Sequence, residues 1–201
     1  MKKILAIAMI AMLAISANAQ NTTQAKRILD KAAAIVGRKG GASANFTMKS
    51  GKYGSASGTV AIKGNKFHAR TSQAMIWFNG KTQWTYLKKS NEVNVSTPTQ
   101  AQQMSMNPYT FIYVYKTGYN MAMQNVSNGY RIHLTALNQK RTIQEMYVTI
   151  GKNYLPRQIR MRQGGTWTTI NISDFKAKNQ SDATFTFRSK DFPSAEVIDL
   201  R

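Results

Sequence analysis

The chain contains no cysteine among its 201 residues. Disulfide bonds, thiolate metal sites and thiol nucleophiles are therefore excluded, and a domain of this size must rely on its hydrophobic core. Histidine is nearly absent as well, since only His68 and His133 occur. Each falls at a polar position of an alternating segment, which favours two solvated strand histidines over a catalytic or metal-binding pair.

Acidic residues are few: 8 Asp and Glu stand against 28 Lys and Arg, and the formal net charge is +20. The carboxylates show no spacing typical of a hydrolase pair. The chain also has no Gly-x-Ser-x-Gly elbow, phosphate-binding loop or His-Glu-x-x-His motif. We therefore expect no enzyme activity, no catalytic residues, no metal and no cofactor. The positive charge either keeps the surface soluble or attracts an anionic partner.

Long apolar runs are absent after the first twenty residues. A short cationic start and an apolar stretch over residues 4–15 precede Ala17 and Ala19, the small side chains that signal peptidase requires. The stretch is shorter than the roughly 20 residues of a membrane anchor. We predict a signal peptide over 1–19, cleaved after Ala19, and one exported domain over 20–201. No cysteine follows the cleavage site, so a lipid-anchored form is not expected, and export argues against a nucleic-acid partner.

A helix is expected at the start of the exported domain. Thr22 or Thr23 is a suitable cap, and Gly37 is a suitable end. Its apolar residues recur at helical spacing, which predicts a stripe that packs on a sheet: Ala25, Ile28, Leu29, Ala32 and Val36.

Beyond residue 41 the pattern changes to an alternation of apolar and polar residues with period two. About eleven strands with short connections are predicted, which indicates one large antiparallel sheet that curls, splits or closes. The predicted segments are 44–49, 58–63, 67–71, the hairpin 75–86, 92–97, 121–126, 130–137, 143–150, 155–162, 166–175 and 184–187.

The hairpin carries the clearest local signal, because Asn79-Gly80 between two β-rich runs predicts a two-residue type I′ turn. In that register Trp77 faces Thr82. Ile76 and Phe78 then lie on one face of the hairpin, and its other face carries Met75, Trp77, Trp84 and Tyr86.

The strand rhythm stops in the middle of the chain. Residues 97–106 are polar and suggest a flexible segment, after which Asn107-Pro108 predicts a cap and the first position of a helix over 109–115. A helix that is apolar nearly all round must be enclosed or must cover an apolar opening. The curled sheet and this helix together indicate a cavity for an apolar ligand, to which adaptable methionines are suited. The predicted lid residues are Tyr109, Phe111, Ile112 and Tyr115.

The order of these elements resembles the periplasmic outer-membrane lipoprotein carriers of the LolA type, from about Ala25 to Arg201. After the leading helix, Ala44-Asn45-Phe46-Thr47-Met48-Lys49 is similar to the family's Ala-x-Phe-x-Gln segment. In the same way, Asn79-Gly80-Lys81-Thr82-Gln83-Trp84-Thr85-Tyr86 resembles its Asp-Gly-x-x-x-Trp-x-Tyr hairpin. The other matching segments are 58–63 with Phe67, 107–109, 155–159 and 192–201.

The resemblance implies a mainly β fold with a few helices: an incomplete, half-open antiparallel β-barrel of about eleven strands with a helical lid. It also implies a soluble periplasmic carrier without a cofactor. Such a carrier holds the acyl chains of lipoproteins or lipid. It receives its cargo from an inner-membrane ATP-driven lipoprotein release complex and hands it to an outer-membrane acceptor. We expect a monomer with no nucleic-acid partner.

On this resemblance, apolar strand residues are expected to line the cavity: Phe46, Met48, Val60, Ile62, Phe67, Met75, Ile76, Trp77, Trp84, Tyr86, Ile159, Met161, Ile170 and Ile172. The family's lid-tying arginine is replaced by Gly64, and its nearby proline is absent. Lys63 and Lys66 are the candidate latch in this divergent member. The cargo and the face that lines the cavity are left open.

Two other functions remain possible on the sequence. The first keeps the fold and makes the protein a sensor or carrier of another amphiphile. The second is an exported basic β-domain that binds polyanions through Lys and Arg interleaved with Trp and Tyr. Polyanion binding weakens steeply with ionic strength, whereas burial of acyl chains does not.

Overall fold

The computed structural model describes residues 21–111 and 113–201, without the side chains of residues 105, 106, 109 and 111. The predicted signal peptide lies outside these residues. Residues 21–36 form the first helix, and its predicted apolar stripe is buried. The predicted caps are wrong, because Thr22 and Thr23 are already helical. Gly37 follows the last helical residue, as predicted.

Strands make up most of the remaining chain: β1 (Ala42–Ser50), β2 (Gly54–Lys63), β3 (Lys66–Thr71), β4 (Ala74–Phe78), β5 (Gln83–Leu87), β6 (Glu92–Ser96), β7 (Tyr119–Val126), β8 (Gly129–Ala136), β9 (Glu145–Gly151), β10 (Pro156–Gln163), β11 (Thr166–Lys176) and β12 (Glu196–Asp199). Within the described ranges they form one twelve-stranded sheet, in the order β12-β6-β5-β4-β3-β2-β1-β11-β10-β9-β8-β7. The sheet stays open between β12 and β7. The predicted mainly β, incomplete barrel is therefore confirmed.

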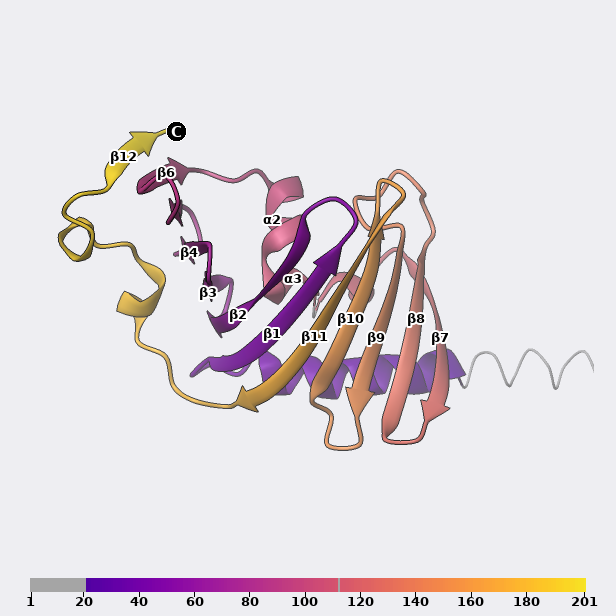
Figure 1. The fold of residues 1–201 in the computed structure, drawn as a ribbon. Coiled ribbons are helices and arrows are strands. Elements are labelled where there is room, and N and C mark those ends of the chain that lie inside the picture. The colour runs from indigo at the N-terminus through magenta and orange to yellow at the C-terminus, as the bar shows by residue number, and fades with distance from the viewer. Residues whose placement is uncertain (1–20, 112) are drawn as a thin grey trace, which may run out of the picture.

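The sheet is strongly bent (Figure 1). Strands β7 to β11 face the viewer, whereas β3 to β6 are seen nearly end-on. The first helix lies behind β7 to β11, and we call this side of the sheet the inner face. The yellow C-terminal segment runs along the opposite side of β3 to β5, which we call the outer face.

Apolar side chains of the inner face form two core clusters. In the first core, the first helix packs on β7 to β10, where Ile132, Leu134 and Met146 are fully buried. In the second core, Val36 at the end of that helix packs with residues of β1 to β4: Ala42, Ile62, Phe67 and Phe78. The first core takes in most of the helix and the second meets only its last turn, with β11 between the two cores in the sheet.

The predicted hairpin register is wrong by two residues. Trp77 pairs with Trp84, so the loop holds four residues, 79–82, and not two. The Asn79 side chain stabilises this loop, because its Oδ1 accepts the backbone N–H groups of Lys81 at 3.0 Å and Thr82 at 2.9 Å. A slip of two residues preserves which face each side chain occupies. The predicted division of the hairpin into two faces is therefore confirmed.

The polar segment before Asn107 is more ordered than predicted. It forms helix α2 (Gln100–Met106), which begins with a capping box between Thr99 and Gln102. The predicted helix over 109–115 is divided into α3 (Pro108–Phe111) and the 3-10 helix η1 (Val114–Lys116).

The C-terminal segment departs from the prediction in two ways. Residues 184–187 are not a strand, because Ser181 caps the 3-10 helix η2 (Asp182–Phe185); a further 3-10 helix, η3 (Ser189–Asp191), follows. The chain then adds β12, which pairs in parallel with β6. All other pairs in the sheet are antiparallel, so the predicted wholly antiparallel sheet is corrected at this edge.

The opposite edge, β7, is covered by the start of the first helix. The amide of Asn21 imitates a peptide group: its Oδ1 accepts the N–H of Met123 at 2.6 Å, and its Nδ2 donates to the carbonyl of Met123 at 3.1 Å. Thr22 donates to the carbonyl of Met121. Pairing the exposed groups of an edge strand in this way discourages addition of a strand from another chain.

Candidate functional site

A band of half-buried apolar side chains crosses the inner face where the sheet bends. Alternation along β1 directs Phe46 and Met48 to this face, and Thr47 and Lys49 to the other. The register places Phe46 beside Ile172 and Met48 beside Ile170 of β11. The band, which we call the inner strip, consists of Phe46, Met48, Val60, Ala69, Ile76, Ile170 and Ile172.

The inner strip joins the two cores. Ile170 and Ile172 pack against the first core, and Val60, Ala69 and Ile76 pack against the second. Among the described residues, Phe46 and Met48 belong to neither cluster. The centre of the strip is therefore apolar surface that the protein's own cores leave incompletely covered.

Four of the residues predicted to line a cavity are instead fully packed in the cores. Ile62 and Phe67 belong to the second core, and Ile159 and Met161 belong to the first. Their exposed fractions are 3 to 6%. They lie inside the two cores that border the strip and are not part of its surface.

Four others lie on the wrong face to line an inner cavity. The register places Met75, Trp77, Trp84 and Tyr86 on the outer face, because they alternate with Ile76 and Phe78. The C-terminal segment covers this outer group: the ring of Phe192 lies 5.6 Å from Trp77 and 4.7 Å from Tyr86 between centroids. Such aromatic contacts are each worth about 0.5–1.5 kcal/mol beyond area burial. The outer group therefore fixes the C-terminal segment to the sheet.

His68 belongs to the same outer layer. Its ring lies 4.9 Å from Trp77 between centroids, and its Nδ1 is 3.0 Å from the carbonyl oxygen of Thr184. Burial lowers the pKa of His68, against the opposing effect of that hydrogen bond. His133 is half-buried on the outer face of β8, 2.9 Å from Glu145. Both histidines thus serve structural contacts of the outer face.

The predicted lid residues divide into two groups. The side chains of Tyr109, Phe111 and Ile112 lie outside the described residues. Tyr115 is 2% exposed, and its hydroxyl donates to Oδ1 of Asp30 on the first helix at 2.6 Å. Burial and this bond raise the pKa of Tyr115 well above its usual range. Tyr115 therefore anchors the 3-10 helix η1 to the first helix.

Helices α2 and α3 make contacts on both sides of the inner strip. Met104 of α2 packs against the first core, and α3 contacts β3 beside the second core. Asn107, between the two helices, is 3% exposed and donates from Nδ2 to the carbonyl of Asn65 at 2.8 Å. Asn65 lies in the turn between β2 and β3. We call α2, Asn107 and α3 the lid, because they connect the two borders of the strip.

In the part of the chain that the structure describes, Lys63 and Lys66, the candidate latch, pair with the C-terminal segment. Their Nζ atoms lie 3.3 Å and 2.9 Å from Oδ1 of Asp182, in the C-terminal segment, and this pairing lowers the pKa of Asp182. The contact between the turn and the lid is made instead by the Asn107 amide. The Asn107-Pro108 pair predicts only a helix cap, and a single sequence carries no signal that the Asn107 side chain reaches another hairpin.

Other types of site find little support in the described part of the chain. It holds no group of three or more His, Asp and Glu side chains placed to bind a metal ion. Among its helices, none combines the length and the apolar character needed to cross a bilayer. A shallow hollow of about 460 Å³ lies along the solvent side of the first helix, beside Lys26 and Asp30, and is lined by that helix alone.

Comparison with known proteins gives a family match and several structural neighbours. Residues 15–165 match the model of the family described as outer membrane lipoprotein carrier protein LolA. A conserved protein from Thermus thermophilus has 15% identity and a TM-score of 0.58, over 88% of this chain and 99% of that chain. A LolA superfamily protein from Nitrosomonas europaea has 14% identity and a TM-score of 0.45, over 81% and 97%. LprF from Mycobacterium bovis has 10% identity and a TM-score of 0.44, over 80% and 96%. A search of curated proteins finds no match.

Proposed function

The chain belongs to the outer membrane lipoprotein carrier family, and on that premise we propose that it holds acyl chains against the inner strip beneath the lid. On this proposal the signal peptide directs a single domain, residues 20–201, to the periplasm. There it acts as a soluble monomer without enzyme activity. It accepts a lipoprotein or lipid from an ATP-driven release complex of the inner membrane and delivers it to an outer-membrane acceptor.

The observation that carries the proposal is the incomplete burial of Phe46 and Met48 between two finished cores. Burial of each methylene is worth about 0.8 kcal/mol, so ten methylenes of one chain contribute about 8 kcal/mol. That value is an upper bound here, because the strip is already half covered. A moderate gain suits a carrier, which has to release what it binds.

A carrier also needs a cover over its binding surface that can open, and we assign this role to the lid. It is built of two short helices, and helices of this length depend on their tertiary contacts for stability. Its attachment to the β2–β3 turn includes one side-chain bond, from Asn107 to a backbone carbonyl. Breaking a bond of this kind requires about 0.5–1.5 kcal/mol net, far less than the burial of an acyl chain returns.

Mass spectrometry under native conditions tests the proposal directly. The protein is purified without detergent from cells that contain both membranes, and the bound mass is identified. We expect diacyl lipid or an acylated lipoprotein. Absence of any acyl ligand, together with failure to release a lipoprotein from spheroplasts, contradicts the proposal. Binding of lipid without release of lipoprotein supports the related function of an amphiphile carrier or sensor.

Two neighbouring substitutions on β1 provide a matched pair for this experiment. Met48→Asp places a carboxylate on the inner strip, whereas Thr47→Asp places the same group on the outer face. We expect the first variant to lose the acyl ligand and the second to keep it, with both chains folded by circular dichroism. Equal retention of ligand by the two variants means that the inner strip is not the acyl site.

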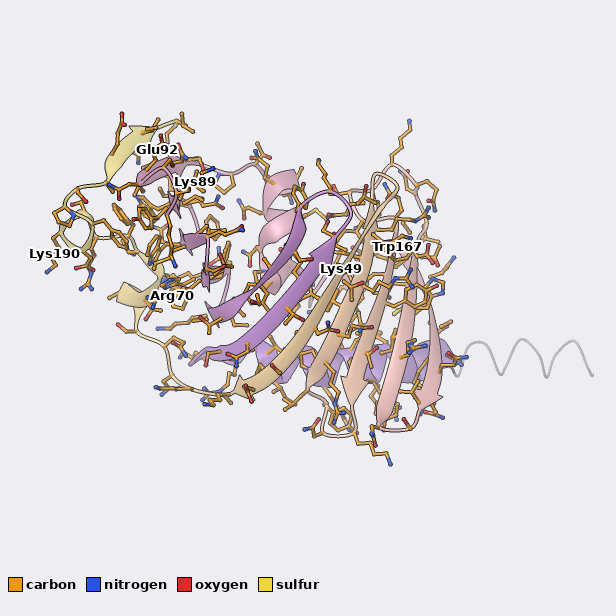
Figure 2. All side chains as sticks on the ribbon, viewed as in Figure 1. Lys49, Arg70, Lys89, Glu92, Trp167 and Lys190 are labelled. Atoms are coloured by element: carbon orange, nitrogen blue, oxygen red, sulfur yellow. The ribbon has the colours of Figure 1, made fainter. Side chains whose placement is uncertain are left out.

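A polyanion-binding function has one specific observation in its favour. On the outer face, the guanidinium of Arg160 lies 4.2 Å from the Trp167 ring centroid, and Tyr147 lies 6.0 Å from Trp167. Trp167 is on the side of the sheet turned away from the first helix (Figure 2). Glu145 lies within this group, however, 3.4 Å from Arg162, and reduces its positive charge. Heparin binding that falls steeply with salt would favour this second candidate.

A further inference from the structure

A polar cavity of about 380 Å³ opens at one end of the inner strip. Three connections form it: the turn after β1, the loop between β8 and β9, and the turn between β10 and β11. The volume lies within the range of small-molecule sites. Its lining includes hydroxyl, amide and cationic side chains and no carboxylate.

The positive charge of the cavity comes from Lys52, Lys140 and Arg141. In the part of the chain that the structure describes, none of the three forms an ion pair with an acidic side chain. Arg141 is held in place, because its guanidinium lies 4.8 Å from the Tyr119 ring centroid. It also covers Gly118, where any β-carbon would collide with its Nη1.

Polar groups on the cavity lining complete the site. Ser50 and Thr168 are buried and share a hydrogen bond of 2.9 Å. The Nε2 atom of Gln163 is buried, and among the described atoms no acceptor is recorded for it. Phosphate oxygens are suited to such a lining, because they accept charge-assisted hydrogen bonds from lysine and arginine side chains.

The cavity continues directly from the inner strip. Along β1, Phe46, Met48 and Ser50 occupy successive inner-facing positions, and Ser50 pairs with Thr168 just as Met48 pairs with Ile170. Two residues of a strand span about 6.6 Å, so the polar cavity begins one side chain beyond the apolar surface. An apolar surface that ends in a cationic cavity is complementary to an amphiphile with an anionic head.

We propose that this cavity binds the phosphate-bearing headgroup of an anionic amphiphile whose acyl chains lie on the inner strip. The inference rests on the proposed acyl-binding function and narrows its cargo. An uncharged diacylglycerol head offers the three cations no anionic partner. A phosphorylated head, in contrast, accepts hydrogen bonds from them.

Calorimetric titration with three defined probes tests the proposal: dihexanoylglycerol 3-phosphate, dihexanoylglycerol and inorganic phosphate, each below any micelle-forming concentration and at 150 mM salt. We expect the phosphorylated amphiphile to bind at least tenfold more tightly than dihexanoylglycerol, and inorganic phosphate to bind far more weakly. One charge-assisted contact is worth about a factor of ten.

Two double variants separate the effect of the cavity from the effect of the overall positive charge. Lys52→Gln with Lys140→Gln removes two charges from its rim, and Lys49→Gln with Lys152→Gln removes two charges elsewhere on the surface. We expect the first pair to weaken binding of the phosphorylated probe about tenfold, and the second to change it less than threefold, because salt screens distant charges. Arg141→Gln should act like the first pair. Thermal unfolding shows whether each variant is folded. If Arg141→Gln is unstable, the test relies on Lys52→Gln with Lys140→Gln alone.

Each other outcome overturns the proposal in a distinguishable way. Equal affinity for the two amphiphiles, unaffected by the rim variants, removes the headgroup site but leaves acyl binding intact. Inorganic phosphate that binds as tightly as the phosphorylated amphiphile makes the cavity a free-anion site. If neither amphiphile binds, the proposed function and this inference both fail.

Discussion

Removing the Asn107 amide tests whether the lid opens at the β2–β3 turn. In Asn107→Ala, the carbonyl of Asn65 loses its donor at 2.8 Å. Asn65 is exposed, so water can replace that donor, and the expected loss is that of an ordinary hydrogen bond, about 1 kcal/mol. The opening equilibrium of the lid then rises about fivefold. In Asn107→Asp, a carboxylate faces the carbonyl oxygen, and the expected loss of about 2 kcal/mol raises opening about thirtyfold.

Hydrogen–deuterium exchange measures this opening, because protection of an amide reports the free energy of the local transition that exposes it. The amides of α2 and α3 should lose protection in the order wild type, Asn107→Ala, Asn107→Asp, while those of β10 stay unchanged. Asn128→Ala and Asn128→Asp, in the exposed β7–β8 turn, are the matched controls. Unchanged protection of the lid in both Asn107 variants would refute the reasoning, as would an equal loss in β10, which indicates global destabilisation.

Other contacts give predictions for stability. Tyr115→Phe removes the bond to Asp30, and because Asp30 is exposed we expect a loss of about 1–2 kcal/mol in urea denaturation. Phe192→Ala should destabilise the chain by about 2 kcal/mol and loosen the C-terminal segment, seen as faster proteolysis there. Burial lowers the folded-state pKa of His68, so the unfolded state binds the proton first as pH falls. Stability should be complete above about pH 6.5 and should fall as pH drops from there through the lowered pKa, and His68→Gln should flatten this dependence in thermal unfolding.

Alternation was sufficient to predict most strands and the face of each residue. The hairpin over 75–86 illustrates why, since its register was wrong by two and its faces were still right. Asn79-Gly80 is typical of a two-residue turn, but here the Asn79 side chain closes a four-residue loop. A side chain that replaces backbone bonds in a turn changes loop length without changing the strand pattern.

The C-terminal segment shows where local pattern fails. Thr184-Phe185-Thr186-Phe187 alternates like a strand, yet Ser181 caps a 3-10 helix there, and Phe187 packs on Trp77 of the distant strand β4. Strand β12 is short and mostly exposed, and it exists because it pairs in parallel with β6. Both outcomes are set by contacts between residues far apart in the chain, which a single sequence does not encode in its local periodicity.

The candidate site was the hardest feature to place, because both faces of β4 are apolar and residue type does not distinguish them. Trp77 and Ile76 are neighbours with similar apolar character. Phe187 and Phe192 cover Trp77, whereas Ile76 is half-buried at the border of the second core. A surface that the chain covers itself contributes to stability, whereas one left half-covered between two cores is available to a ligand. Substitutions of the outer group should therefore reduce stability, and substitutions at the centre of the inner strip should reduce binding first.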